Sequence, residues 1–96
     1  MMQPDENMEF LFKCMAAVDN EEDVKCFLED LCSMSEIQEM SRRIKAARML
    51  ADGYIYSEIA TQTGLSTATI SRVNRCLKYG NNGYMKALTA VKKSEK

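Results

Sequence analysis

The sequence predicts an all-α fold of about six helices. Every strong hydrophobic periodicity in the 96 residues follows the helical spacing of three to four residues. No segment alternates between apolar and polar residues as a half-buried strand does, and neither an internal repeat nor an interdomain linker is present. Cap and stop residues stand between the periodic segments, which supports the same conclusion.

Three helices are expected in the first half of the chain. An apolar stripe marks the first helix: Phe10, Leu11, Cys14, Met15 and Val18. Asn20 is expected to cap the second helix, with acidic residues after it near the positive end of the helix dipole. Ser35 and Gln38 form a capping box that begins a longer third helix, and Gly53 is expected to end it.

Three shorter helices are expected in the second half. Two of them lie near Ser57–Thr63 and Thr67–Lys78, and the turn residues 80–83 follow. Apolar residues at helical spacing then mark the last helix: Tyr84, Met85, Leu88 and Val91.

The net charge of −1 hides a separation of charge between the two halves. Residues 1–34 hold nine acids against two lysines, a net charge of −7, whereas residues 35–96 hold eleven bases against five acids, a net charge of +6. A local basic field attracts phosphates even when the whole molecule is close to neutral. The separation therefore points towards nucleic acid, although a solvated acidic face would produce it equally well.

The apolar content is small for a core that one chain has to build alone. Leu, Ile, Val and Phe together make nineteen of the 96 residues, so eight methionines have to fill much of the interior. A chain of this length buries only about 60–65% of its unfolded surface. We therefore expect a homodimer in which two copies share a core.

Several classes of protein are excluded by what the sequence lacks. It has no histidine, no glycine-rich phosphate loop and no carboxylate cluster beside a nucleophile, so we expect no enzyme, no metal and no cofactor. The longest apolar run, Cys14–Val18, is too short to span a membrane, and the acidic N-terminus is unlike a signal peptide. The four cysteines lack CxxC spacing. We expect reduced thiols in a cytoplasmic protein, with a redox pair as the minor alternative.

Residues 56–75, YSEIATQTGLSTATISRVNR, have the spacing of a helix-turn-helix. Ala60 supplies the small residue needed where the two helices cross closely, and Gly64, four residues later, tolerates the positive φ of the turn. Thr63 stands where an aliphatic residue is commoner. Four apolar residues fall where the motif needs anchors: Ile59, Leu65, Ile70 and Val73.

The second helix of this motif has an outward face suited to DNA. Ser66 is expected to cap it and to leave N–H groups that can meet a phosphate. The face opposite the anchors carries no acid and consists of Thr67, Ala68, Ser71, Arg72 and Arg75. We expect the first four of these to contact the groove or its bases, and Arg75 and Lys78 to contact phosphates. A helical hairpin with a purely structural role would have the same turn, but it would not require a basic face free of acids.

From about residue 34 to residue 88 the sequence resembles the Trp repressor family, and within it the YerC/YecD group of Trp-repressor-related proteins. The long helix, with the sequence SRRIKAARMLADG, leads directly into the helix-turn-helix. The second helix of that motif, called the reader here, contains ATISR. The resemblance implies a Trp-repressor-like fold and an intertwined homodimer on double-stranded DNA. In such a dimer, residues 1–34 of each chain would form an acidic helical dimerisation arm. Residues 35–96 would hold the long helix, the reader and the C-terminal helix, and the whole chain would be one domain.

The resemblance also implies where a small-molecule corepressor pocket would lie. Family members hold an indole between two arginines, which match Arg43 and Arg72, and a pocket threonine matches Thr69. The family's pocket glycine and serine are replaced here by Val73 and Cys76. The valine fills space beside the backbone, and the thiol is a poor hydrogen-bond donor. We therefore expect a protein that does not depend on tryptophan.

Arg43 also has a purely structural interpretation, which we prefer, as an i,i+4 partner of Glu39. The sequence as a whole favours a sequence-specific DNA-binding transcriptional regulator, a dimeric repressor. Two alternatives stay open: a repressor gated by another small ligand between the long helix and the reader, and a helical module that binds an acidic protein. Salt-dependent retention on duplex DNA separates the last of these from the others.

Overall fold

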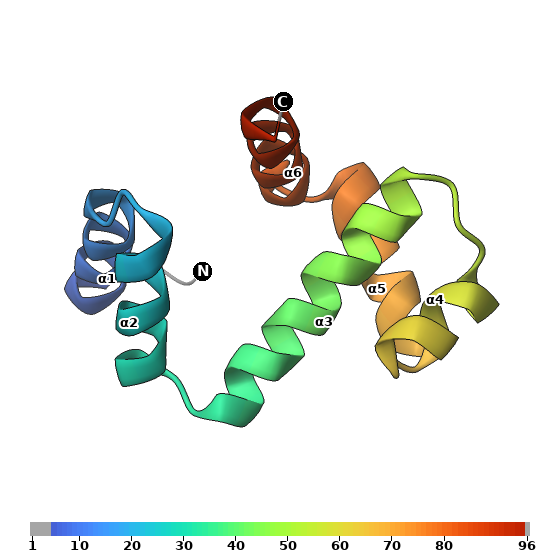
Figure 1. Cartoon of the computed structure of the whole chain (residues 1–96), viewed down its shortest axis with the longest axis horizontal. Coiled ribbons are helices and arrows are strands. Elements are labelled where there is room, and N and C mark those ends of the chain that lie inside the picture. Colours follow the sequence, from blue (N-terminus) through green and yellow to red (C-terminus); the bar gives the residue numbers. More distant parts are fainter. Residues whose placement is uncertain (1–4, 96) are drawn as a thin grey trace. The chain divides into compact units, whose positions relative to one another are not determined.

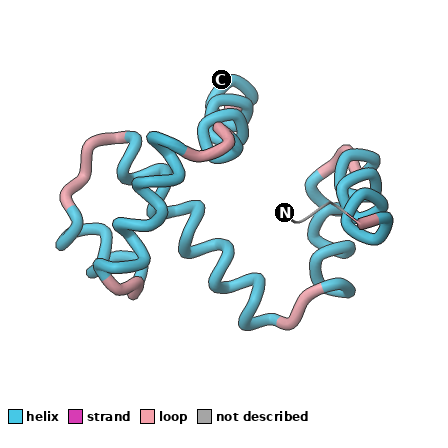
Figure 2. The backbone as a smooth tube through the Cα atoms, turned by 180° about the vertical axis from the view of Figure 1, so that it is seen from behind, coloured by secondary structure: helices cyan, strands magenta, loops and turns pink. Residues whose placement is uncertain are grey.

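A computed structural model describes residues 5–95 and confirms the all-α prediction, with no strand in that range. Figure 2 shows the run of helices and loops along the backbone. The six helices are α1 (Glu6–Ala17), α2 (Glu21–Leu31), α3 (Met34–Ala51), α4 (Tyr56–Thr63), α5 (Thr67–Tyr79) and α6 (Gly83–Ser94). The chain divides into two compact units, one that ends at Ile37 and one that begins at Gln38. No helix within residues 5–95 is long and apolar enough to cross a membrane.

The first unit contains α1 and α2, each begun by a side-chain cap. The Asp5 carboxylate accepts the Met8 N–H at 2.7 Å. Asn20 caps α2 as predicted, because its side-chain oxygen accepts the Asp23 N–H at 2.9 Å. The α1 helix ends at Ala17, so Val18, which was expected on its apolar stripe, lies just outside it in extended backbone (φ −80°, ψ 116°). Neither helix contains a buried residue.

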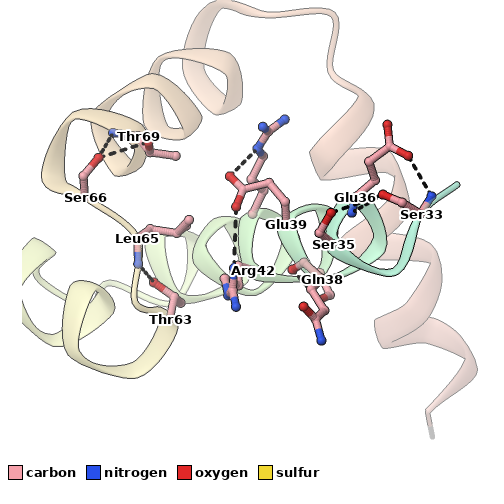
Figure 3. A network of polar contacts seen from close by, with 12 residues as sticks. Ser33, Ser35, Glu36, Gln38, Glu39, Arg42, Thr63, Leu65, Ser66 and Thr69 are labelled. Atoms are coloured by element: carbon pink, nitrogen blue, oxygen red, sulfur yellow. Dashed lines mark hydrogen bonds and ion pairs between the residues drawn. The ribbon is translucent and has the colours of Figure 1, made fainter.

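The capping box that begins α3 lies two residues before the predicted one, so the prediction of Ser35 and Gln38 is wrong. The Ser33 hydroxyl accepts the Glu36 N–H at 3.2 Å, and the Glu36 carboxylate accepts the Ser33 N–H at 2.7 Å (Figure 3). A carboxylate is a stronger acceptor than the Gln38 amide for a backbone N–H at a helix start. The hydrogen bonds from Ser33, that of its backbone N–H above all, hold the pKa of the Glu36 carboxyl below its ordinary value.

The α3 helix ends at the predicted glycine. Gly53 has φ 91°, and its N–H donates to the Leu50 carbonyl at 3.1 Å, while the Tyr54 N–H reaches back to the Met49 carbonyl at 3.0 Å. This pair of hydrogen bonds is a Schellman motif, which satisfies two carbonyls at the helix end. It ends α3 cleanly before the short loop to α4.

The core of the second unit joins the C-terminal half of α3 to α4 and α5 (Figure 1). It is a cluster of Ala46, Met49, Ile59, Leu65 and Ile70, and three partly buried side chains pack against it: Leu50, Tyr56 and Ala60. The helix α4 contacts α5, and α5 contacts α6. Full burial of an Ile side chain contributes about 1.5–3 kcal/mol. The cluster therefore joins the helix-turn-helix to α3.

Candidate nucleic-acid interface

The turn between α4 and α5 is built as the sequence predicts. Gly64 is the C-cap of α4 in the left-handed region (φ 76°, ψ 4°), and its N–H donates to the Ala60 carbonyl at 2.9 Å. A residue with a Cβ is strained in that conformation, which explains the glycine. Ala60 packs against the core, as expected for the small residue of the motif.

Thr63 has a role in the turn that its polarity alone did not reveal. The residue is buried, and its hydroxyl donates to the Ile59 carbonyl at 2.7 Å. The same oxygen accepts the N–H of Leu65, also buried, at 3.2 Å (Figure 3). A buried N–H without a partner would cost about 1–3 kcal/mol. A threonine therefore replaces the usual aliphatic residue without loss, because its hydroxyl is satisfied on both sides.

The four predicted anchors are confirmed as buried side chains. Ile59 and Ile70 are fully buried, and Leu65 and Val73 retain 7% and 3% of their exposure. Together they hold α4, the turn and α5 against α3. The orientation of α5 follows from this arrangement, because its opposite face has to point to solvent.

The start of α5 is capped and solvent-exposed. The Ser66 side-chain oxygen accepts the Thr69 N–H at 3.1 Å, and its hydroxyl donates to the Thr69 hydroxyl at 3.1 Å. The N–H groups of Thr67 and Ala68, at the positive end of the helix, have no hydrogen-bond partner within residues 5–95. Both residues are exposed, so an anion can approach these donors.

The outward face of α5 carries the predicted residues on one side of the helix. Thr67, Ala68, Ser71, Arg72, Arg75 and Lys78 are all exposed. The helix contains no acidic residue. Within residues 5–95 the ion pairs all use arginines of α3, so the three bases on α5 have no acidic partner there. This face can meet an anionic surface without first breaking ion pairs.

One exposed residue of α5 is missing from the sequence-based set. Tyr79, the last residue of the helix, is 83% exposed, more than any other large apolar or aromatic side chain in the described part of the chain. It follows Ala68, Arg72 and Arg75 at spacings of four, three and four residues, which place it on the same helix face. A helical projection of the sequence carried to the end of the helix would have found it.

Each residue expected near a corepressor either makes another contact within the protein or is exposed to solvent. The Arg43 Nε atom lies 3.3 Å from the Glu39 carboxylate, so the predicted i,i+4 pair is present. Arg42 approaches the same carboxylate at 3.7 Å (Figure 3). Val73 is buried, whereas Cys76 is exposed. Thr69 donates its N–H to the side chain of the N-cap residue Ser66, and Arg72 lies on the outward face of α5.

Comparison with known proteins agrees with this geometry. The family model described as Trp repressor protein matches residues 6–92. The uncharacterized protein YerC of Bacillus subtilis (strain 168) is 48% identical over 85 residues, which cover 88% of this chain and 82% of that protein. Two solved structures also match: a TrpR-like protein from Eubacterium eligens ATCC 27750 and a proposed Trp repressor from Staphylococcus aureus.

Both structural matches are close over nearly the whole chain. The first has a TM-score of 0.84 and 40% identity, and covers 91% of this chain and 90% of that one. The second has a TM-score of 0.84 and 39% identity, and covers 92% and 88%. The fold and the exposed α5 define a helix-turn-helix protein of the DNA-binding, regulatory class. The chain belongs to the Trp repressor family, and within it to the group related to YerC.

Proposed function

We propose that this protein is a dimeric, sequence-specific transcriptional repressor that reads DNA with α5 and does not require tryptophan. One observation carries the proposal: the outward face of α5 holds Arg72, Arg75 and Lys78 with no acid on the helix and no ion-pair partner within residues 5–95. Phosphate contacts supply much of the affinity of DNA-binding proteins, and base contacts supply the sequence preference.

The proposed roles follow the position of each residue along α5. Thr67, Ala68 and Ser71 are small and stand at the start of the helix, where a recognition helix comes closest to base edges. Arg72 is long enough for a bidentate contact to a guanine, the commonest specific contact in a major groove. Arg75 and Lys78 lie further along and are assigned to phosphates. The unpaired N–H groups after Ser66 give one more phosphate contact.

The dimer is proposed because the first unit cannot bury its own apolar side chains. Phe10 and Phe12 are 68% and 57% exposed, and Leu31 is 52% exposed. Several large apolar side chains exposed in succession mark an interaction surface rather than a solvent face. We assign residues 1–34 the role of a dimerisation arm that packs on a second copy.

The second unit offers a surface that this arm can cover. A groove of about 940 Å³ runs between α3 and α6, and its apolar lining includes Ile44, Met49, Met85, Leu88 and Val91. Lys45, Arg48 and Lys92 also line it. Asp52 and Glu95 line it as well, and Glu95 pairs with Arg48 at 3.6 Å, so the groove is only slightly basic. An arm from a second copy therefore matches the groove chiefly in apolar surface, and the net charges of −7 on the arm and +6 on the remainder favour the same association.

Independence from tryptophan is proposed on the burial of Val73, which is 3% exposed. A side chain enclosed to that degree leaves no room beside it for an indole unless α5 moves. Glu39 moreover already supplies Arg43 with a carboxylate at 3.3 Å. The exposed Cys76 offers no strong hydrogen bond in return.

Selection of bound fragments from random duplex DNA tests the proposal most directly. The full-length protein should enrich one sequence with twofold symmetry and bind it without tryptophan. Its half-sites should lie about 34–36 Å apart, one turn of the duplex. The logarithm of its affinity should fall linearly with the logarithm of the salt concentration. Enrichment of no sequence, with weak retention that does not depend on salt, would instead indicate a helical protein-interaction module.

A further inference from the structure

The outward stripe of α5 continues past its arginines to a residue of a different chemical kind. Ala68, Arg72, Arg75 and Tyr79 follow one another at spacings of four, three and four residues, which is one face of an α-helix. All four are exposed, and Tyr79 is 83% exposed. A phenol that continues a basic stripe differs from a lone surface tyrosine, because it faces whatever the arginines face.

Side-chain length along this face increases towards the C-terminal end of α5. Small residues stand at its start, in Thr67, Ala68 and Ser71, and long ones follow. Small side chains let the helix start come close to base edges, and longer ones are needed where the helix lies further from them. Ala68 and Tyr79 are eleven residues apart, about 16 Å along the helix axis. The major groove is only about 12 Å wide, so a helix seated at Ala68 carries Tyr79 to the phosphate backbone at its edge.

The end of the helix fixes the backbone at Tyr79. The N–H of Gly80 donates to the Cys76 carbonyl at 2.9 Å, so the last turn of α5 is closed. No hydrogen bond engages the Tyr79 hydroxyl within residues 5–95, and the neighbouring Lys78 is exposed too. The hydroxyl is thus available to donate a hydrogen bond to a phosphate oxygen.

We propose that Tyr79 is a DNA-backbone contact, in which its hydroxyl donates a hydrogen bond to a phosphate oxygen at the edge of the major groove. The inference rests on the proposed DNA-reading role of α5 and adds a contact of a different kind. Lys and Arg release counterions when they neutralise a phosphate, whereas a neutral phenol does not. Tyr79 therefore contributes affinity that depends neither on base sequence nor on salt.

Fluorescence anisotropy with a selected duplex and an unrelated duplex of equal length, over a series of salt concentrations, tests this contact. Tyr79→Phe, which removes only the hydroxyl, should weaken binding about threefold per half-site, and so about tenfold for a dimer on two half-sites. The loss should be equal on both duplexes, and the salt slope should not change. Lys78→Ala is the charged comparison and should reduce that slope by about one for each lost contact.

The matched control is Tyr84→Phe, which removes the hydroxyl of a half-buried tyrosine of α6 that does not line the groove between α3 and α6, and it should leave affinity unchanged. Circular dichroism of both variants checks that the helices are intact. Tyr79→Phe with wild-type affinity overturns the inference, as does a loss confined to the selected duplex or a reduced salt slope. Failure of the proposed function looks different, because then the wild type binds neither duplex, or Arg72→Ala binds as the wild type does.

Discussion

The Thr63 hydroxyl accepts the backbone N–H of Leu65 at 3.2 Å and so closes the turn of the helix-turn-helix across Gly64. It donates at the same time to the Ile59 carbonyl at 2.7 Å. The turn that places the reader is therefore held by a buried side chain as well as by a glycine. The contribution of this side chain to stability can be tested without a substitution on the exposed face of α5.

Thr63→Val should destabilise the protein by about 1–3 kcal/mol, because it keeps the side-chain shape but leaves the buried Leu65 N–H without an acceptor. Thr63→Ser retains the hydroxyl and should keep this hydrogen bond. Urea denaturation followed by circular dichroism measures both. If Thr63→Val is as stable as the wild type, the turn does not depend on this contact.

Arg72→Ala should weaken binding to a selected operator by about 1–3 kcal/mol and relax the base preference at one position. Arg75→Ala should weaken binding to all sequences alike and reduce the salt slope by about one for each lost phosphate contact. Both side chains are exposed, so helix content and oligomeric state should not change.

Arg42→Ala is the matched control for these two variants, since it removes an exposed arginine of α3 that pairs with Glu39 at 3.7 Å. It should bind the operator as the wild type does. Operator affinity that survives both Arg72→Ala and Arg75→Ala would show that the face assigned to DNA is wrong.

The protein should sediment as a dimer wherever it is folded. Phe10→Gln or Phe12→Gln should shift it towards monomer or unfolded chain, since each ring is more than half exposed in one protomer and packs against a second copy in the proposed dimer. Deletion of residues 1–33 should unfold the chain or leave a marginal monomer. Glu22→Asp, an exposed change on α2 that keeps the charge of the arm, is the control. A stable, folded monomer at micromolar concentration would contradict this prediction.

Tryptophan should neither bind at millimolar concentration nor raise operator affinity. The physical reason is the buried Val73, which stands at the proposed pocket position and would leave no room there for an indole. Calorimetry with and without operator measures both effects, and a tenfold rise in affinity would correspond to about 1.4 kcal/mol of coupling.

The double change Val73→Gly with Cys76→Ser should gain measurable tryptophan binding. Loss of the buried valine and a glycine within α5 will also cost stability, so circular dichroism has to show that the variant is folded. A folded variant without tryptophan binding would refute the assignment of these two positions to a pocket.

The capping box gives the start of α3 a pH dependence. Hydrogen bonds from Ser33 lower the pKa of Glu36 in the folded state, so their contribution is complete above the ordinary carboxyl pKa and is lost as pH falls through the lowered one. Ser33→Ala keeps the backbone N–H, the larger cause, and should raise the Glu36 pKa only part of the way. NMR titration of the Glu36 carboxyl measures the shift, with Ser41→Ala as the control. An unchanged titration would show that the hydroxyl plays no part.

The amino-acid sequence alone was enough to place the helices and the helix-turn-helix, because their determinants are local. Asn20, Gly53 and Gly64 act on backbone groups within a few residues, and the apolar spacing of Ile59 and Ile70 follows directly from the helical repeat. Locality also explains the error at α3. Ser33 and Ser35 both fit a cap pattern three residues before a polar acceptor, and the pattern does not rank a carboxylate above an amide.

Burial and exposure required the tertiary structure, since they depend on residues far apart in the sequence. From sequence Thr63 is a departure from the motif, whereas in the folded protein it is buried where α4 packs against α5, and its hydroxyl accepts the Leu65 N–H. The bases of α5 could be placed on one face from sequence, but their lack of acidic partners within residues 5–95 is a property of the folded surface. The exposure of Tyr79 is likewise a property of the folded protein. Neither α4 nor α6 covers this side chain, although α5 contacts both helices.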